Sequence, residues 1–189
     1  MVGYQETINE KISNFGVEVI NAGMVDSPEK AKVAAALLKK QDVELVFLYV
    51  STYALSSTVL PVAQKVKVPL IILNLQPTAQ LDYKSFNNLK DRGLMTGVWL
   101  ENCQACSVPE IANVFNRSRI QYDFVTGYLQ DKDAWTEIKA WTEAADVAHK
   151  MKNNRLGVLG HYYNGMLDVY SDLTKQSVAF GTHICMSSA

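Results

Sequence analysis

The sequence has 189 residues, of which 48% are hydrophobic and 20% charged, the proportions of an ordinary globular protein. Its formal net charge of −1 excludes the basic surface that binds nucleic acid or an anionic membrane. Because no apolar run reaches the roughly 20 residues of a membrane span and no signal-peptide core opens the sequence, we expect a cytoplasmic protein with no nucleic-acid and no membrane partner.

Helices and strands alternate along the first half of the sequence. Ile8, Ile12 and Phe15 share one helical face, which predicts a helix over residues 4–15 that ends at Gly16. The elements expected after it are a short strand at 17–23, a helix capped by Asp26 or Ser27 with Pro28 in its first turn, a buried strand at 43–50, a helix at 55–67, a buried strand at 68–75 and a loop at 76–83.

The alternation continues in the second half. Ser107 and Glu110 have the spacing of a capping box, which predicts that a helix begins at Ser107. The elements expected after it are a strand at 121–129, a long helix at 131–151, a strand from Arg155 and a last strand at 177–189. Strands joined by helices imply right-handed crossovers within one parallel sheet.

These elements predict an α/β fold with a Rossmann or flavodoxin-like doubly wound parallel sheet over residues 1–152, followed by the start of a second α/β domain over 153–189. A doubly wound sheet normally opens with a strand, whereas this sequence opens with a helix. The first domain is therefore expected to lack its first strand. The elements after Arg155 are too few to close a core of their own. An uncovered sheet edge predicts self-association.

Polar side chains follow several of the expected strands, and open α/β sheets bind ligands beyond the carboxyl ends of their strands. In chain order the candidates are Tyr53 after Ser51 and Thr52, Gln76, Gln104, Gln130 with Asp131, and His161 with Tyr162 and Tyr163. Hydroxyl, amide and aromatic groups suit a neutral polyhydroxylated ligand such as a sugar. No glycine-rich phosphate motif follows a strand. Tyr53 equally fits a packing residue, and His161 equally fits a hydrogen-bonded loop histidine.

Cys103 and Cys106 form a Cys-x-x-Cys pair in a sequence with three cysteines. A thioredoxin-like redox pair opens a helix, whereas the capping box begins this helix only at Ser107. A structural zinc needs a second pair of ligands at suitable spacing, and the sequence has none. We therefore expect these cysteines to be buried small side chains, and a thiol-redox protein is the disfavoured interpretation.

Five motifs resemble, in order, segments of the L-arabinose and L-fucose isomerases, most closely the arabinose-isomerase-like branch. They are YALSSTVLPV, LNLQPTAQLDY, MTGVWLENCQACSVPEIANVFNR, VTGYLQD and GHYYNGMLDVYSD. The resemblance runs over nearly the whole chain from about Gly3. It implies a sugar isomerase that interconverts an aldose and a ketose with a divalent metal, usually Mn²⁺, and that assembles as a trimer or hexamer.

The resemblance covers only the N-terminal part of the longer family members. The family's metal-binding and catalytic residues lie farther downstream, so we expect no catalytic residue, no metal-binding residue and no bound Mn²⁺ in this chain alone. The resemblance does carry substrate positions over. It implies that Gln104 reaches the active site of a neighbouring subunit, that Met166 lines the sugar pocket and that Gln76 lies in a loop that approaches the sugar.

Ser107 departs from the family pattern, because the arabinose isomerases have a histidine there. This difference argues against L-arabinose itself as the substrate. The expected function is the N-terminal portion of a metal-dependent sugar isomerase that supplies substrate contacts and an oligomer interface and is inactive alone. The alternative is a non-catalytic sugar-binding module.

Overall fold

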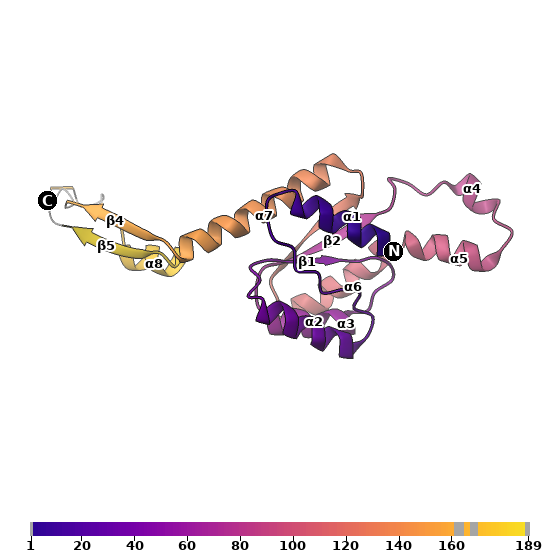
Figure 1. The fold of residues 1–189 in the computed structure, drawn as a ribbon, viewed down its shortest axis with the longest axis horizontal. Coiled ribbons are helices and arrows are strands. Elements are labelled where there is room, and N and C mark those ends of the chain that lie inside the picture. The colour runs from indigo at the N-terminus through magenta and orange to yellow at the C-terminus, as the bar shows by residue number, and fades with distance from the viewer. Residues whose placement is uncertain (1, 161–164, 167–169, 188–189) are drawn as a thin grey trace. The chain divides into compact units, whose positions relative to one another are not determined.

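The structure, a computed structural model, describes residues 2–160, 165–166 and 170–187 (Figure 1). It is a mixed α/β chain with two small parallel sheets, one of three strands and one of two. The chain divides into two compact units, Met1–Thr142 and Glu143–Ala189. The division falls within helix α7 (Lys132–Lys152).

Helices and strands alternate through the first unit. In chain order they are α1 (Val2–Ser13), α2 (Pro28–Lys40), β1 (Val46–Tyr49), α3 (Ser56–Val66), β2 (Leu70–Gln76), α4 (Tyr83–Asn87), α5 (Arg92–Glu101), α6 (Gln104–Arg117) and β3 (Tyr122–Tyr128), with α7 continuing into the second unit. The helices predicted at 4–15, 55–67 and 131–151 and the strands predicted at 68–75 and 121–129 are thereby confirmed.

The sheet of the first unit has the strand order β1-β2-β3, and its strands are parallel. Leu70 at the start of β2 lies level with Val46 of β1 and with Tyr122 of β3, and β2 and β3 run on to the pair Gln76 and Tyr128. The first six residues of β2 are buried. They are buried because β2 has a strand on each side and helices on both faces, and this accounts for the continuous apolar run in its sequence.

Two hydrophobic clusters cover the two faces of this sheet. One joins α1 and α7 to the sheet, and its buried members are Ile8, Ile12, Ile71, Leu73, Leu75, Val125, Leu129, Ala134 and Ile138. The other joins α3 and α6 to the sheet, and its buried members are Val50, Val59, Ala63, Leu70, Ile72, Val108, Ile111 and Phe115. Alternate residues of β2 belong to opposite clusters, as the two-residue period of a strand requires. Each fully buried Leu, Ile or Phe contributes about 1.5–3 kcal/mol, so these clusters are the main source of stability.

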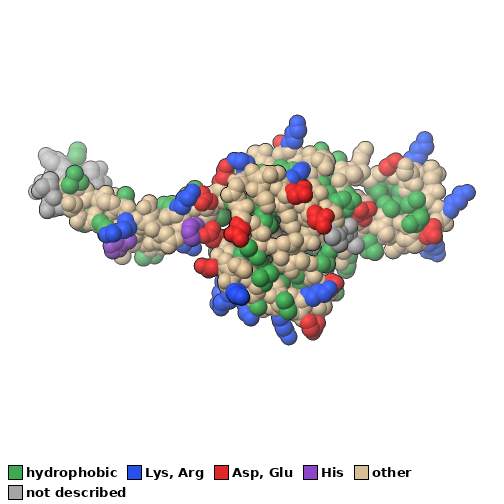
Figure 2. Space-filling view, in the orientation of Figure 1, with side chains coloured by type: hydrophobic (Ala, Val, Ile, Leu, Met, Phe, Trp, Pro, Cys, Tyr) green, Lys and Arg blue, Asp and Glu red, His purple; other side chains and the backbone are tan. Residues whose placement is uncertain are grey.

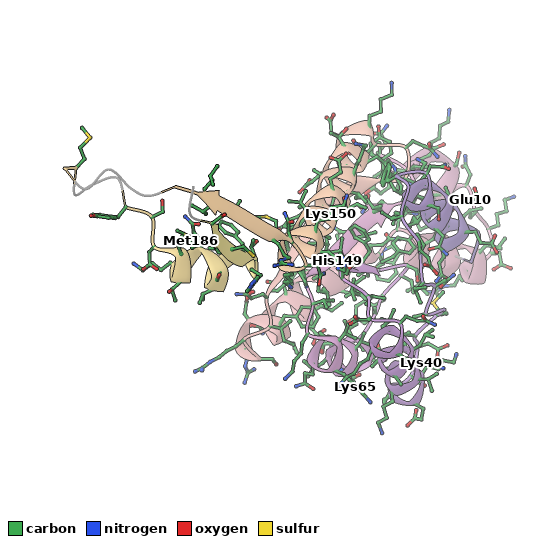
Figure 3. The ribbon with its side chains drawn as sticks, turned by 60° about the vertical axis from the view of Figure 1, so that its left-hand side comes forward. Glu10, Lys40, Lys65, His149, Lys150 and Met186 are labelled. Carbon is green, nitrogen blue, oxygen red and sulfur yellow. The ribbon has the colours of Figure 1, made fainter. Side chains whose placement is uncertain are left out.

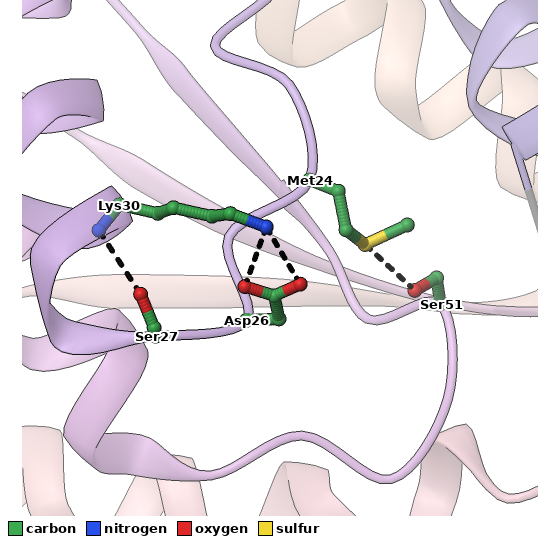
Figure 4. A network of polar contacts seen from close by, with 5 residues as sticks. All are labelled: Met24, Asp26, Ser27, Lys30 and Ser51. Carbon is green, nitrogen blue, oxygen red and sulfur yellow. Dashed lines mark hydrogen bonds and ion pairs between the residues drawn. The ribbon is translucent and has the colours of Figure 1, made fainter.

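Two helices begin as the sequence predicts. Ser27 is the N-cap of α2, where its hydroxyl accepts a hydrogen bond from the Lys30 amide at 3.2 Å, and Pro28 occupies the first turn (Figure 4). The Lys30 ammonium donates a second hydrogen bond, 2.8 Å long, to Asp26 and thereby lowers the pKa of that carboxyl. At α7 the Asp131 carboxylate accepts hydrogen bonds from two amides of the first turn.

The segment after α1 contradicts one prediction. Gly16 follows the helix with a φ of +84°, a left-handed conformation that favours glycine. Residues 17–23 then continue without secondary structure, so the strand predicted there is wrong. A strand requires a ladder of backbone hydrogen bonds, and this segment forms none with the described strands. Val17 and Val19 instead pack, half-buried, against the cluster of α1 and α7. β1 was predicted to be buried and is half-buried, because it lies at the edge of the described sheet.

The second unit contains the end of α7, β4 (Arg155–Leu159), α8 (Leu173–Phe180) and β5 (His183–Ser187). β4 and β5 are parallel, with Arg155 opposite His183. The last strand, predicted at 177–189, is wrong in its first part, because α8 extends through Phe180 and ends at Gly181, whose φ is +72°. None of the residues described in this unit is buried.

Charges of both signs are mixed on the surface. Lys, Arg, Asp and Glu side chains are interspersed over the face shown in Figure 2, in keeping with the net charge of −1. Glu10 on α1, Lys40 on α2 and Lys65 on α3 are exposed (Figure 3). Within the described ranges, no helix is both long enough and apolar enough to cross a membrane.

Candidate functional site

The carboxyl ends of the parallel strands form one edge of the first unit's sheet, which we call the carboxyl edge. Residues 51–53 follow β1 after Val50, Gln76 is the last residue of β2, and Tyr128 is the last residue of β3. Parallel strands present their carboxyl ends on the same side, so the candidates that follow β1 and β2 lie at a common edge. This is the edge at which open α/β sheets bind their ligands.

Gln104 joins the start of α6 to the loop after β1. Its side-chain amide nitrogen donates to the carbonyl oxygen of Ser51 at 3.3 Å and to that of Glu101 at 2.7 Å. The Thr52 hydroxyl donates to the Leu100 carbonyl oxygen at 2.9 Å, which fastens the same loop to the end of α5. Gln104 is 0% exposed. It therefore holds the loop in place, and a small molecule in solution does not reach it in this conformation.

Ser107 and Glu110 do not form the capping box that their spacing predicts. The Ser107 hydroxyl accepts a hydrogen bond from the Ala54 amide at 2.7 Å. The Glu110 carboxylate accepts one from the Ser56 amide at 3.1 Å and another from the Ser56 hydroxyl at 2.6 Å. Both side chains are thus occupied by the start of α3, whose N-cap residue, Leu55, has no side-chain oxygen to offer. The predicted start of α6 at Ser107 is wrong, and the helix begins at Gln104.

The earlier start of α6 changes the surroundings of the cysteine pair. Cys103 is the N-cap residue and Cys106 lies in the first turn, with 2.6 Å between the two sulfur atoms. The expectation that both cysteines are buried holds for Cys103 and is wrong for Cys106, which is exposed. The argument against a redox pair was that the helix begins only after both cysteines. Because α6 begins at Gln104, that argument is wrong.

A tyrosine pair and a glutamate meet beside the carboxyl edge. The Tyr4 hydroxyl donates to the Glu101 carboxylate at 2.6 Å, and this hydrogen bond raises the pKa of Tyr4. Burial raises the pKa of Tyr49, the last residue of β1, to about 12, with smaller contributions from Tyr4 and Glu101. Both phenols therefore remain protonated at neutral pH. The sequence offered no local signal for this group, because Tyr4 and Glu101 are separated by 97 positions.

Three buried side-chain atoms have no hydrogen-bond partner among the described residues: the Tyr49 hydroxyl, Oδ1 of Asn74 and Oε1 of Gln104. Tyr49 ends β1, Asn74 lies near the end of β2, and Gln104 bonds the loop after β1. Tyr49 and Asn74 thus belong to the carboxyl half of the sheet, whereas Gln104 belongs to α6 and contacts the loop beyond the sheet. Buried polar atoms without partners are rare in folded proteins, and these three gather near one edge of the sheet.

The candidates predicted from the sequence fall into three groups. Tyr53, 54% exposed, and Gln76, half-buried, lie at the carboxyl edge. Gln104 is buried beneath the loop that carries Tyr53 and bonds the Ser51 carbonyl oxygen of that loop. Met166, 55% exposed, belongs to the second unit. His161 lies outside the described residues. Sequence reasoning missed Asn74, although a single amide within the apolar run of β2 was a signal for it.

A cavity of about 640 Å³ lies at the opposite, amino edge of the sheet. Its lining includes Lys67, Leu70, Arg119, Tyr122 and Trp141. The carboxyl ends of α3 and α6 border this cavity and present backbone carbonyl oxygens to it. Open parallel sheets, by contrast, bind their ligands beyond the carboxyl ends of the strands, which lie at the other edge. We therefore assign the candidate site to the carboxyl edge and not to this cavity.

The described residues bring together no group of three or more His, Cys, Asp and Glu side chains that could hold a metal ion. The carboxylates of Glu101, at the end of α5, and of Asp131, after β3, are engaged in hydrogen bonds within the fold. These residues do not fit Mn²⁺, and we derive no step that passes through a metal. No protein-family model matches the chain, and it has no significant match among curated proteins.

Proposed function

We propose that this chain is the N-terminal portion of a metal-dependent aldose–ketose isomerase that resembles the L-arabinose and L-fucose isomerases. In this proposal the first unit is a flavodoxin-like, doubly wound domain of a cytoplasmic enzyme. It supplies contacts to the sugar and a surface for assembly as a trimer or hexamer. In the family the residues that hold Mn²⁺ and carry out isomerisation belong to later domains, so in this proposal the chain alone is inactive.

The observation that carries the proposal is the collection of amide and hydroxyl groups at the carboxyl edge. Gln76 and Tyr53 are accessible there. An amide can donate to one sugar hydroxyl and accept from the next, and a phenol ring can pack against the apolar face of a sugar. Gln104 positions the loop of Tyr53 through its bond to the Ser51 carbonyl oxygen.

The segment of α4 and α5 offers the assembly surface. Neither helix buries a residue. Tyr83, Leu94 and Trp99 are 69%, 61% and 51% exposed. Apolar side chains gathered on an exposed segment mark an interaction surface, and the trimer or hexamer of the family would cover them.

A non-catalytic sugar-binding module is the second candidate function. One observation favours it: Tyr53 and Gln76 both belong to the first unit, so a sugar could bind them without any contribution from the second unit. The two candidates therefore differ in whether the chain binds a sugar by itself.

Calorimetric titration with a panel of pentoses and hexoses, with and without Mn²⁺, separates the two candidates. Binding of one sugar without Mn²⁺, lost in Gln76→Ala, supports the binding module. Absence of binding supports the isomerase portion, whose pocket is completed by other domains. Light scattering tests the isomerase proposal independently. A trimer or hexamer that dissociates in the variant Leu94→Ser/Trp99→Ser supports it, and a monomer at all concentrations contradicts it.

A further inference from the structure

Two of the three cysteines meet at the start of α6. Cys103 occupies the N-cap, Cys106 lies in the first turn, and their sulfur atoms are 2.6 Å apart. A Cys-x-x-Cys pair at a helix start is the arrangement that supports thiol–disulfide exchange. The two sulfur atoms are in contact, as the formation of a disulfide bond of about 2.05 Å requires.

The two sulfurs differ in their access to solvent. Cys106 is exposed, whereas Cys103 is 2% exposed. Burial raises the pKa of Cys103 to about 11, and its hydrogen bond to Cys106 adds to the increase. Before the reaction, Cys103 is therefore protonated and shielded from reagents in solution, while it touches the sulfur that such a reagent meets first. Once the Cys106 thiol has reacted, its contribution to the raised pKa of Cys103 is lost.

We propose that Cys103 and Cys106 form a reversible dithiol–disulfide site, in which Cys106 attacks a small-molecule disulfide and Cys103 resolves the product. The Cys106 sulfur, after losing its proton to solvent, bonds to one sulfur of the reagent RSSR. The S–S bond breaks, and RS⁻ leaves and takes up a proton. Cys103 then gives its proton to solvent and attacks the Cys106 sulfur, which expels a second RS⁻ that is protonated in turn. One RSSR is reduced to two RSH, and the protein loses two electrons and two protons.

This site does not depend on the proposed sugar function, because neither step needs a sugar or a metal. Access and contact assign the order of the steps. The exposed sulfur is the one that a dissolved disulfide reaches, and the buried sulfur is already positioned for the second attack.

The test uses the full chain and glutathione disulfide as the oxidant. We expect the intact mass to fall by two hydrogens, peptide mapping to join Cys103 to Cys106, and dithiothreitol to restore the starting mass. Failure to form this bond overturns the proposal. A bond that joins either residue to Cys185 instead also overturns it.

Variants test the assigned order. In Cys103→Ser, a glutathione adduct should accumulate on Cys106, and serine is a favourable N-cap that preserves the helix. In Cys106→Ser, the reaction at position 103 should be at least about tenfold slower, because that sulfur is buried and protonated. Cys185→Ser is the matched control and should close the bond at the wild-type rate. Equal reaction rates in Cys103→Ser and Cys106→Ser overturn the order.

Discussion

Replacing Glu110 with alanine should destabilise the first unit by about 1 kcal/mol, although Glu110 is exposed and lies inside α6. The reason is that Glu110 caps α3. Its carboxylate accepts hydrogen bonds from the Ser56 amide at 3.1 Å and from the Ser56 hydroxyl at 2.6 Å, whereas Leu55, the N-cap residue, makes no side-chain cap. The change thus removes the equivalent of one N-cap, which typically contributes about 0.5–2 kcal/mol.

Urea and thermal unfolding followed by circular dichroism measure this loss. For a chain of this length, about 1 kcal/mol corresponds to a fall in Tm of about 2–4 °C. Glu137→Ala is the matched control, because Glu137 is an exposed glutamate of α7. We expect that variant to remain within about 0.5 kcal/mol of the wild type. Glu110→Gln keeps an acceptor without the charge and should fall between the two.

A rescue variant sharpens the test. Leu55→Asp places a carboxylate at the N-cap of α3 itself, so it should restore about 1 kcal/mol to Glu110→Ala. In the wild type the cap is already present, and the gain should be much smaller. Equal gains in the two backgrounds would show that Glu110 and the N-cap position act independently and would refute the reasoning.

Three further predictions concern the sheet and its edge. Gly127→Ala should cost about 1–3 kcal/mol in chemical denaturation, because the new Cβ would lie 2.6 Å from the Asp131 carboxylate. Gly97→Ala is the control: its new Cβ would meet no atom within 4 Å, so this variant should be neutral or stabilising by up to about 1 kcal/mol. Asn74→Leu removes a buried oxygen without a described partner, but it also removes the hydrogen bond that the Asn74 amide nitrogen donates to the Thr126 hydroxyl at 3.2 Å. The two effects oppose each other, so the stability should stay within about 1 kcal/mol of the wild type; a loss above about 2 kcal/mol would contradict this balance. The raised pKa of Tyr49 contributes stability that is complete below about pH 10 and is lost as the pH rises through about 12, so the urea midpoint should fall over that range in the wild type and less in Tyr49→Phe.

Elements with local signals could be predicted from the sequence. The continuous apolar run of β2 identifies a strand with helices on both faces, and the structure buries its first six residues. Ser27 followed by Pro28 and Asp131 before α7 are caps whose partners lie within one turn, so neither depends on the rest of the fold.

Features that depend on distant partners could not be predicted. Residues 17–23 have the composition of a strand, but a strand needs a neighbour, and among the described residues none pairs with this segment. The same limit applies to the candidate site. Tyr4 and Glu101 bond across 97 positions, and the loop of Tyr53 is held by Gln104 from α6. Which residues lie at the carboxyl edge can be predicted from the order of the strands. Which contacts hold them there cannot, because those contacts depend on how distant segments pack.

The start of α6 shows how tertiary contacts can mislead a prediction made from a local motif. Ser107 and Glu110 have the spacing of a capping box, yet the Ala54 amide and the Ser56 amide engage their side chains. α6 begins at Gln104, three residues before the predicted start, and has Cys103 as its N-cap. The cysteine pair thus passes from an expected loop to a helix start, where thiol–disulfide exchange is favoured. In this chain the capping-box spacing therefore does not mark a helix start, and both side chains bond the start of α3 instead.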